Sequence, residues 1–483
     1  MAVHSLGAYQ TKIYQFIFGL VIVALGFLAV RRMIAGTVKS GQMIAALILG
    51  VIAMLVLDRR YWLLMPILGG FGMKVPGLPF SGGELGQIAV VGIHFLRLGL
   101  HRDSPAKLDE RTWPVVPVFF WIAGIFCLNP AGLAMFGSAT IGSRFYGQIA
   151  LGFCFFFALS AQRLNESDCK ILFRIMVAAA AFRLCREIVI PPSDPDAIVA
   201  IGDVPERNSI YALIGFGTLY AYVFARHELA SILRSLPLLA TTVLLALMTT
   251  ASGKRQAFGR LLIVPWISAF LRAKGRGLTI LRSFIGLVLA LFAIAGDGAF
   301  YTLPKSARRS LAILAPQKYF SGSSTVGAKD FFREQMRKQA RIVIAEHPFV
   351  GRKGFAMDLE TTAWGLGGRF GRYEGHAYTG NWHSTWYAFA ADFGIPCMLL
   401  FAWFFLKATA FEIRQCRLIR PDTFAFVLMV FYATETLCTL AFSYTSGHSA
   451  MSFSKLCENY GWAIAIASSA FHQGISRYKM SLS

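Results

Sequence analysis

A histidine followed by a serine, His383-Ser384, stands where a long polar segment gives way to an apolar run. Nine residues separate Ser384 from Gly394. A helix beginning here would hold His383 at the boundary between water and lipid, with Ser384 as its N-cap and Gly394 leaving room for another helix. Because an imidazole takes up a proton near neutral pH, His383 is a candidate general base. The alternative is a histidine that only anchors a helix end.

Two adjacent cations, Lys254 and Arg255, interrupt an apolar region at its outer end. They fall on the side opposite the short basic loops, so the rule that positive loops stay in the cytoplasm does not account for them. Paired cations at a membrane boundary suit a phosphate group. The alternative is that both side chains extend to lipid head groups.

A third cationic feature lies in the segment 329–347, which has helical character and precedes Pro348. Arg333, Arg337 and Arg341 recur every four residues, which would place them on one face of a helix on the outer surface. The alternative is a solvated face or a contact with anionic lipid.

Charged residues within apolar runs are costly in a membrane and often functional. Arg186 lies near the outer end of one such run, where it would join a phosphate site. Glu435, and the pair Lys455 and Glu458, lie in later runs and suit structural ion pairs as well as they suit catalysis.

Metal ligands and cofactor motifs are scarce in the chain. Asp194-Pro-Asp196 has the Asp-x-Asp pattern of a metal site, but it stands in a short acidic turn that follows two further prolines. The eight cysteines are scattered singly, so neither a zinc site nor a disulfide framework is expected. We therefore predict no metal and no cofactor.

The elements that must position these residues are membrane helices. Hydrophobic residues make up 56% of the 483, and the mean hydropathy is +0.56. Apolar runs recur along the chain, and each is long enough to cross about 30 Å of hydrocarbon. We predict an all-α, polytopic transmembrane bundle of about 12–14 spans. These are 13–30, 42–57, 61–73, 84–100, 114–133, 145–161, 171–190, 208–225, 236–251, 257–271, 283–300, 384–406, 423–442 and 451–470.

The net charge of +22 is spread among loops instead of forming one basic face, which argues against nucleic acid as a partner. The short basic loops 226–234, 272–276 and 407–420 are expected in the cytoplasm. The acidic loop 191–207 and the long segment 301–382 then face outward. We expect three parts: membrane helices over 1–300, one large periplasmic loop over 301–383, and C-terminal membrane helices over 384–483.

Taken together, these features resemble the O-antigen ligase and Wzy-type polymerase superfamily of bacterial membrane glycosyltransferases. The family's His-Asn/Ser-x9-Gly signature is matched by His383, Ser384 and Gly394. Its Thr-x-Ser-Arg-like motif has a counterpart in 250–255, and its Arg…His-Pro-x-x-Gly segment in 333–351. The chain departs from the family pattern in three places: Cys397 in place of a small residue, Arg337 in place of Trp, and a Lys254-Arg255 pair displaced by two residues.

The resemblance implies a donor glycan on undecaprenyl pyrophosphate, in a bacterial inner membrane with the active site facing the periplasm. His383 would be the base, and Arg255, Lys254, Arg333 and Arg186 would bind the pyrophosphate. The acceptor would be another lipid-linked glycan, in a polymerase, or lipid A–core, in a ligase. Membrane lipids, a flippase and a chain-length regulator would be partners. A transporter is the rival of another class, but it predicts an internal repeat that the sequence does not show.

Overall fold

The computed structural model describes residues 60–70, 80–101, 103–129, 143–189, 208–251, 255–272, 324–355, 382, 384–443 and 448–480, with a few residues of 280–286. The side chains at 143, 183–189, 208–216, 248–251, 255–258, 324–334 and 469–480 are not among those described. Within these residues the chain is helical throughout and has no strand, which confirms the predicted all-α class.

The helices begin and end close to the predicted spans over most of the described chain. They are η1 Tyr61–Leu63, α3 Leu64–Gly70, α4 Gly82–Gly99, α5 Val115–Leu128, α6 Ser143–Ser160, α7 Glu166–Val189, α9 Asn208–Arg226, α10 Leu229–Arg234, α11 Leu236–Ala251, α12 Arg255–Arg272, α15 Ser324–Glu346, α18 Thr385–Phe393, α19 Ile395–Leu418, α20 Phe424–Phe442 and α21 Ser449–Met480. The spans predicted at 13–30 and 42–57, and most of 283–300, lie outside the described residues.

Two predicted spans are wrong in their extent. The span 451–470 ends ten residues before α21 does. The sequence indicated a single helix over 384–406, but the structure has two helices, α18 and α19, that are broken at Gly394. The φ angle of Gly394 is +89°, outside the helical region and one that residues with a Cβ rarely adopt. Pro396 then stands in the first turn of α19, where its missing N–H costs no hydrogen bond.

Two of the described helices are long and apolar enough to cross a membrane, α19 (Ile395–Leu418) and α20 (Phe424–Phe442). Shorter apolar helices lie at Tyr61–Gly70, Val115–Leu128, Arg144–Ser160 and Leu236–Leu247. The structure therefore gives limited support to membrane association. The larger number of spans stays a prediction.

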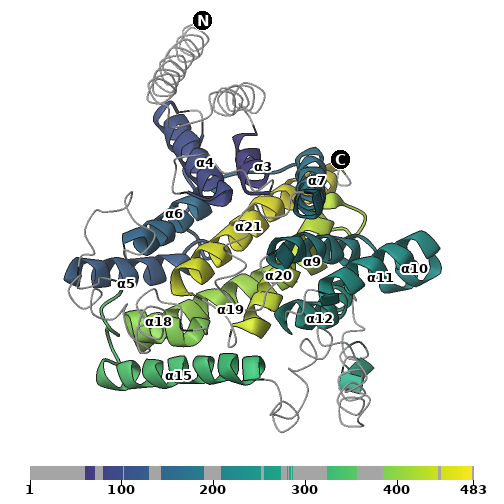
Figure 1. Cartoon of the computed structure of the whole chain (residues 1–483). Helices are drawn as coiled ribbons and strands as arrows, with labels where there is room; N and C mark the ends of the chain where they lie inside the picture. The colour runs from purple at the N-terminus through teal and green to yellow at the C-terminus, as the bar shows by residue number, and fades with distance from the viewer. Residues whose placement is uncertain are drawn as a thin grey trace, which may run out of the picture.

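The long helix α21 crosses the bundle and packs along α6 (Figure 1). Two glycines allow the close approach. A Cβ on Gly152 of α6 would come within 2.9 Å of the Ser454 backbone, and one on Gly461 of α21 would come within 3.2 Å of Leu159. Helices meeting through small residues in this way gain dispersion contacts that do not depend on water.

Cations gather at one end of the bundle, which we call the basic end. The guanidinium of Arg226, at the end of α9, lies 4.7 Å from the Phe424 ring centroid. That of Arg272, at the end of α12, lies 5.2 Å from the Phe426 ring centroid. Both rings belong to the first turn of α20. Burial, and then the charges of Arg226 and Arg272, lower the pKa of His227. Two of the predicted cytoplasmic loops, 226–234 and 272–276, therefore begin side by side.

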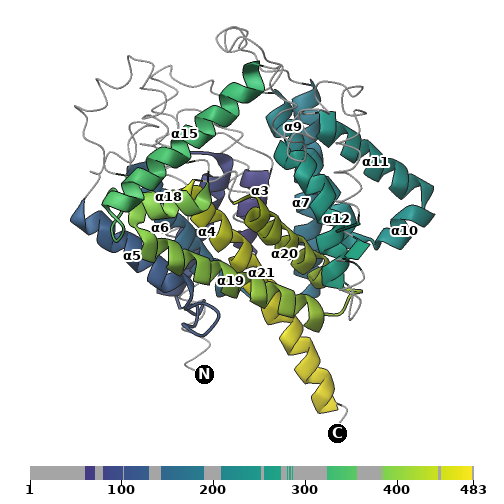
Figure 2. The same cartoon turned by 90° about the horizontal axis from the view of Figure 1, so that it is seen from below.

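The opposite end, which we call the α18 end, holds α18 and the last turn of α20. The backbone N–H of Thr385 donates to the Ser443 carbonyl at 2.8 Å, and Trp386 Nε1 donates to Ser443 Oγ at 2.7 Å. The helix α15 lies across the outside of the bundle next to α18 in both views (Figures 1 and 2). The part of the predicted periplasmic loop that is described thus contacts the end opposite the basic end.

Candidate functional site at the α18 end

The start of α18 differs from the sequence prediction. Ser384 occupies the N-cap position, as expected, but its side chain makes no capping hydrogen bond. The residue is fully buried, and its Oγ has no hydrogen-bond partner among the described residues. The start of α18 is held instead by the two bonds to Ser443 at the end of α20. The prediction that Ser384 caps this helix is therefore wrong.

A turn after α15 binds the other end of α18. The N–H of Arg352 donates to the Ala391 carbonyl at 2.8 Å, and that of Gly354 donates to the Asp392 carbonyl at 2.7 Å. The N–H of Ile395 donates to the Pro348 carbonyl at 2.7 Å. The last carbonyls of a helix have no hydrogen-bond donor within the helix. Here the turn 347–355 supplies N–H donors to two of these carbonyls. Two of the motifs found in the sequence are therefore bound to each other.

The geometry of this contact depends on two glycines with positive φ. Gly351 has a φ of +57°, and a Cβ there would meet the Ala391 carbonyl. Gly394 has a φ of +89°, and a Cβ there would overlap the Phe349 carbonyl. The sequence predicted that Gly394 admits another helix. The structure shows that it admits the backbone of the turn.

Asp392 is the buried centre of the contact. Its carboxylate has no exposed surface, and it accepts hydrogen bonds from Trp382 Nε1 at 2.9 Å and Ser449 Oγ at 2.8 Å. One guanidinium nitrogen of Arg352 lies 2.9 Å from Asp392 Oδ1. The guanidinium also stacks over the Trp382 ring, 5.5 Å from its centroid. A buried carboxylate is tolerated only when it is paired and hydrogen-bonded, as it is here.

The helix α15 packs on α18 through an apolar face. Met336 and Ala340 are buried against Trp382, Ala388 and Ala391. On the exposed side Arg341 Nε donates to Tyr387 Oη at 3.3 Å. The predicted helix over 329–347 is thus confirmed. The position of Arg333 lies on it, but its side chain is outside those described.

The start of α12 belongs to the same end of the bundle. A Cβ on Gly259 would come within 2.6 Å of the Phe442 ring, so α12 packs tightly on the last turn of α20. Arg260 and Glu435 form an ion pair at 3.3 Å between these two helices. The sequence reading singled out Glu435 but missed Arg260. The signal available was a cation within the apolar run that follows Arg255.

The predicted site residues are only partly placed. His383 and Lys254 lie outside the described residues, as do Asp194 and Asp196. Arg255 is the first residue of α12, and Arg186 lies near the end of α7, with neither side chain described. The helix α7 runs parallel to α20, because Glu166 accepts from the Phe424 N–H and Met176 accepts from Tyr432 Oη. The Arg186 position is therefore toward the α18 end.

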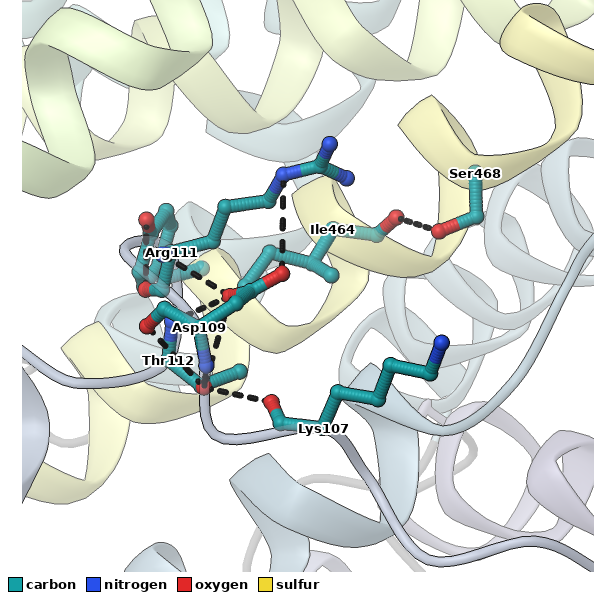
Figure 3. A network of polar contacts seen from close by, with 7 residues as sticks. Lys107, Asp109, Arg111, Thr112, Ile464 and Ser468 are labelled. Carbon is teal, nitrogen blue, oxygen red and sulfur yellow. Dashed lines mark hydrogen bonds and ion pairs between the residues drawn. The ribbon is translucent and has the colours of Figure 1, made fainter.

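A second polar network precedes α5 and has a structural role (Figure 3). Thr112 Oγ1 donates to the Lys107 carbonyl at 2.7 Å, and the Asp109 N–H lies 3.0 Å from the same hydroxyl. Tyr460 Oη of α21 donates to the Arg111 carbonyl at 2.9 Å. These bonds fix the turn that leads into α5 and fasten it to α21. The turn therefore needs no bound ligand to explain its polar residues.

The pair Lys455 and Glu458 is likewise structural, with Nζ and Oε1 at 2.9 Å.

No model of a known protein family matches the chain, and no curated protein resembles it significantly. The arguments for function therefore rest on the motifs and on their arrangement.

Proposed function

We propose that the chain is a membrane glycosyltransferase that acts on a glycan carried by undecaprenyl pyrophosphate. One observation carries the proposal: the three segments that resemble the family motifs meet at the α18 end. The turn 347–355 is bonded to the end of α18, the start of α18 is bonded to the end of α20, and the start of α12 packs on that same turn of α20. In sequence these segments span residues 250–394.

The proposed reaction is a direct displacement with inversion. His383 removes the proton from an acceptor hydroxyl, and the oxygen forms a bond to the anomeric carbon of the donor. The bond from that carbon to the pyrophosphate oxygen breaks, and its electron pair leaves with undecaprenyl pyrophosphate. Arg255 and Arg333, with Lys254 and Arg186, offset the negative charge of the leaving group. No metal is required, so activity should persist in excess EDTA.

The favoured product is a polymer of a surface or exported polysaccharide, made by adding one lipid-linked unit to another. The second candidate is ligation of the glycan to lipid A–core, which uses the same chemistry. Glycan profiling of a deletion strain separates the two. Loss of the polymer ladder with single units remaining indicates a polymerase, and free lipid-linked polymer indicates a ligase. An unchanged glycan profile would contradict both.

Orientation is the second requirement of the proposal, since the donor is used on the periplasmic side. The gathering of Arg226 and Arg272 at the opposite end supports it, because positive loops stay in the cytoplasm. Ser323→Cys, in a variant that lacks the native cysteines, tests it with a maleimide that does not cross the inner membrane. Labelling in intact spheroplasts is expected. Labelling only after the membrane is permeabilised would reverse the orientation and remove the mechanism.

A further inference from the structure

The Asp392 carboxylate joins three parts of the chain that are distant in sequence. It bonds to Trp382 before α18, to Ser449 at the start of α21, and to Arg352 in the turn after α15. The carboxylate is fully buried, so its two oxygens are used for these contacts and not for solvent. It therefore cannot reach an external sugar hydroxyl, which excludes Asp392 itself as the base.

Trp382 and Ser384, which flank His383 in the sequence, both belong to this buried region. Trp382 is buried, its indole N–H donates to the Asp392 carboxylate, and the Arg352 guanidinium lies over its ring. Ser384 is also fully buried. Its hydroxyl makes no capping bond, so the serine does not fasten its own helix start. The polar contacts that fix the Trp382 side chain come from Asp392 and Arg352, and its apolar contacts come from Met336 and Ala340 of α15.

We propose that the Arg352–Asp392 ion pair is a positioning device that fixes the chain directly before His383, while the bonds to Ser443 fix the start of α18 after it. What the positioned histidine does rests on the proposed function. The ion pair holds Trp382 in place, and the turn that carries Arg352 binds the end of α18. Breaking the pair is expected to loosen the chain beside His383 without removing any group that touches the donor or acceptor. An error of about 1 Å in the position of a catalytic group can lower a rate by about a hundredfold.

Charge supports a positioning role over a purely stabilising one. A buried ion pair contributes little net stability compared with apolar side chains of the same size. A structural contact at this place would need only apolar groups, like those that join α15 to α18 through Met336 and Ala340. The pair instead supplies directed bonds in fixed geometry, because a guanidinium and a carboxylate meet at defined angles.

The test uses a cysteine at the buried position next to His383. In full-length Ser384→Cys protein, maleimide labelling of that peptide is followed by mass spectrometry. We expect slow labelling, and labelling at least about tenfold faster when Asp392→Asn is added, because local opening then costs less. Arg352→Lys should give an intermediate rate. It also serves if the Asp392 variant does not fold.

Two controls accompany the labelling. Asp422→Asn removes an exposed ion pair with Arg420 at the basic end and should leave the rate unchanged. Cys457, which is fully buried on α21, reports global unfolding if it becomes labelled. A rate in Asp392→Asn within about twofold of the parent, with Cys457 still protected, would overturn the proposal.

Activity gives a readout that a structural role would not move. In a background with Ser384 intact, Asp392→Asn should lower kcat by at least about tenfold while KM stays within about threefold. Arg352→Lys should recover part of kcat. If labelling accelerates but kcat is unchanged, the pair does not position a catalytic group. If the parent protein transfers no glycan at all, the proposed function fails, and the labelling still decides whether the pair holds the chain beside His383.

Discussion

The two ends of the bundle satisfy their buried polar groups in different ways. At the basic end Asp103 accepts from Tyr61 Oη at 2.9 Å and from Arg97 Nε at 3.0 Å. Burial raises the pKa of Asp103, but hydrogen bonds from His94, Arg97 and Tyr61 outweigh it and hold the pKa below its usual range. Gln162 completes the network by donating to Tyr61 Oη at 2.6 Å. These groups hold together η1, the end of α4 with the loop after it, and the residues that follow α6.

Positive φ angles and buried polar atoms without a hydrogen-bond partner among the described residues occur at both ends. At the basic end His101 has a φ of +55°, and Arg272 Nε has no hydrogen-bond partner among those residues. At the α18 end Gly351 and Gly394 adopt positive φ, and the buried Ser384 hydroxyl has no partner among the described residues. Local strain and an unpaired buried group persist only where the surroundings impose them, and they cluster at functional sites. Because such features occur at both ends, they do not separate the ends by themselves. What distinguishes the α18 end is that the segments resembling the family motifs meet there, so the proposed chemistry is expected at that end.

The strongest test of this comparison replaces one histidine at each end with alanine. His383→Ala should lose about 10²–10⁴ of the turnover, the usual contribution of a general base. The matched variant His227→Ala, at the basic end, should turn over like the parent. The parent's rate should also fall at low pH, as an imidazole with an ordinary pKa of about 6.5 protonates. Single-turnover transfer from a lipid-linked donor measures both.

Near-parent turnover in His383→Ala would reduce His383 to a helix-end anchor. The base would then be sought among the other proton acceptors of the long polar segment before α18, Glu374 and His376, since the buried Asp392 is excluded. Equal losses in His383→Ala and His227→Ala would remove the difference between the ends.

The next largest effect is expected when a glycine with a positive φ is replaced by alanine. Gly394→Ala should lower the free energy of unfolding by about 1–3 kcal/mol, because alanine disfavours a φ of +89°. Its Cβ would also overlap the Phe349 carbonyl. Gly124→Ala on α5 is the control, since nothing lies within 4 Å of a Cβ there. Alanine should stabilise that helix by about 0.5–1 kcal/mol. Thermal unfolding in detergent compares the two, and similar melting temperatures would refute the strain.

The sequence predicted the helices well, since most predicted spans from 84–100 onward end within a few residues of the observed helices. Hydropathy reports where apolar runs lie, and these runs are the helices. It missed the break at Gly394, because a positive φ is imposed by the turn that packs there. Neither that turn's contact with α18 nor the backbone angle leaves a local hydropathy signal.

The residues of the candidate site could be predicted from sequence motifs, but the contacts between those residues could not. The histidine, the two glycines and the cations could be named from residue type and spacing. The ion pair of Arg352 with Asp392 could not, because the two residues are 40 positions apart in the sequence. Arg260 with Glu435 is a second example, since the helices that carry them meet only in the fold. Pairing between distant segments is set by tertiary packing.

Cations at the two ends should differ in their effect on catalysis. Arg255→Ala and Arg333→Ala should each lower turnover by at least about tenfold, which corresponds to about 1.4 kcal/mol of transition-state stabilisation. Lysine at either position should rescue only partly, because it lacks a bidentate contact. Arg420→Ala, at the exposed end of α19, should leave turnover unchanged. If the first two variants also transfer glycan like the parent, both arginines contact lipid and not pyrophosphate.

The smallest effect compares two helix starts. Thr423 caps α20 at the basic end, where its Oγ1 accepts from the Phe426 N–H at 3.2 Å and donates to the Arg420 carbonyl at 2.7 Å. Thr423→Ala should therefore cost about 1 kcal/mol, as the loss of an N-cap usually does. Ser384 holds the same position on α18 but makes no capping bond. Ser384→Ala should change the free energy of unfolding by less than about 0.5 kcal/mol, because it removes a buried hydroxyl that has no hydrogen bond to lose. Unfolding of the two variants under identical conditions measures the difference. Equal destabilisation would mean that Ser384 does cap α18, and that both ends of the bundle begin their helices in the same way.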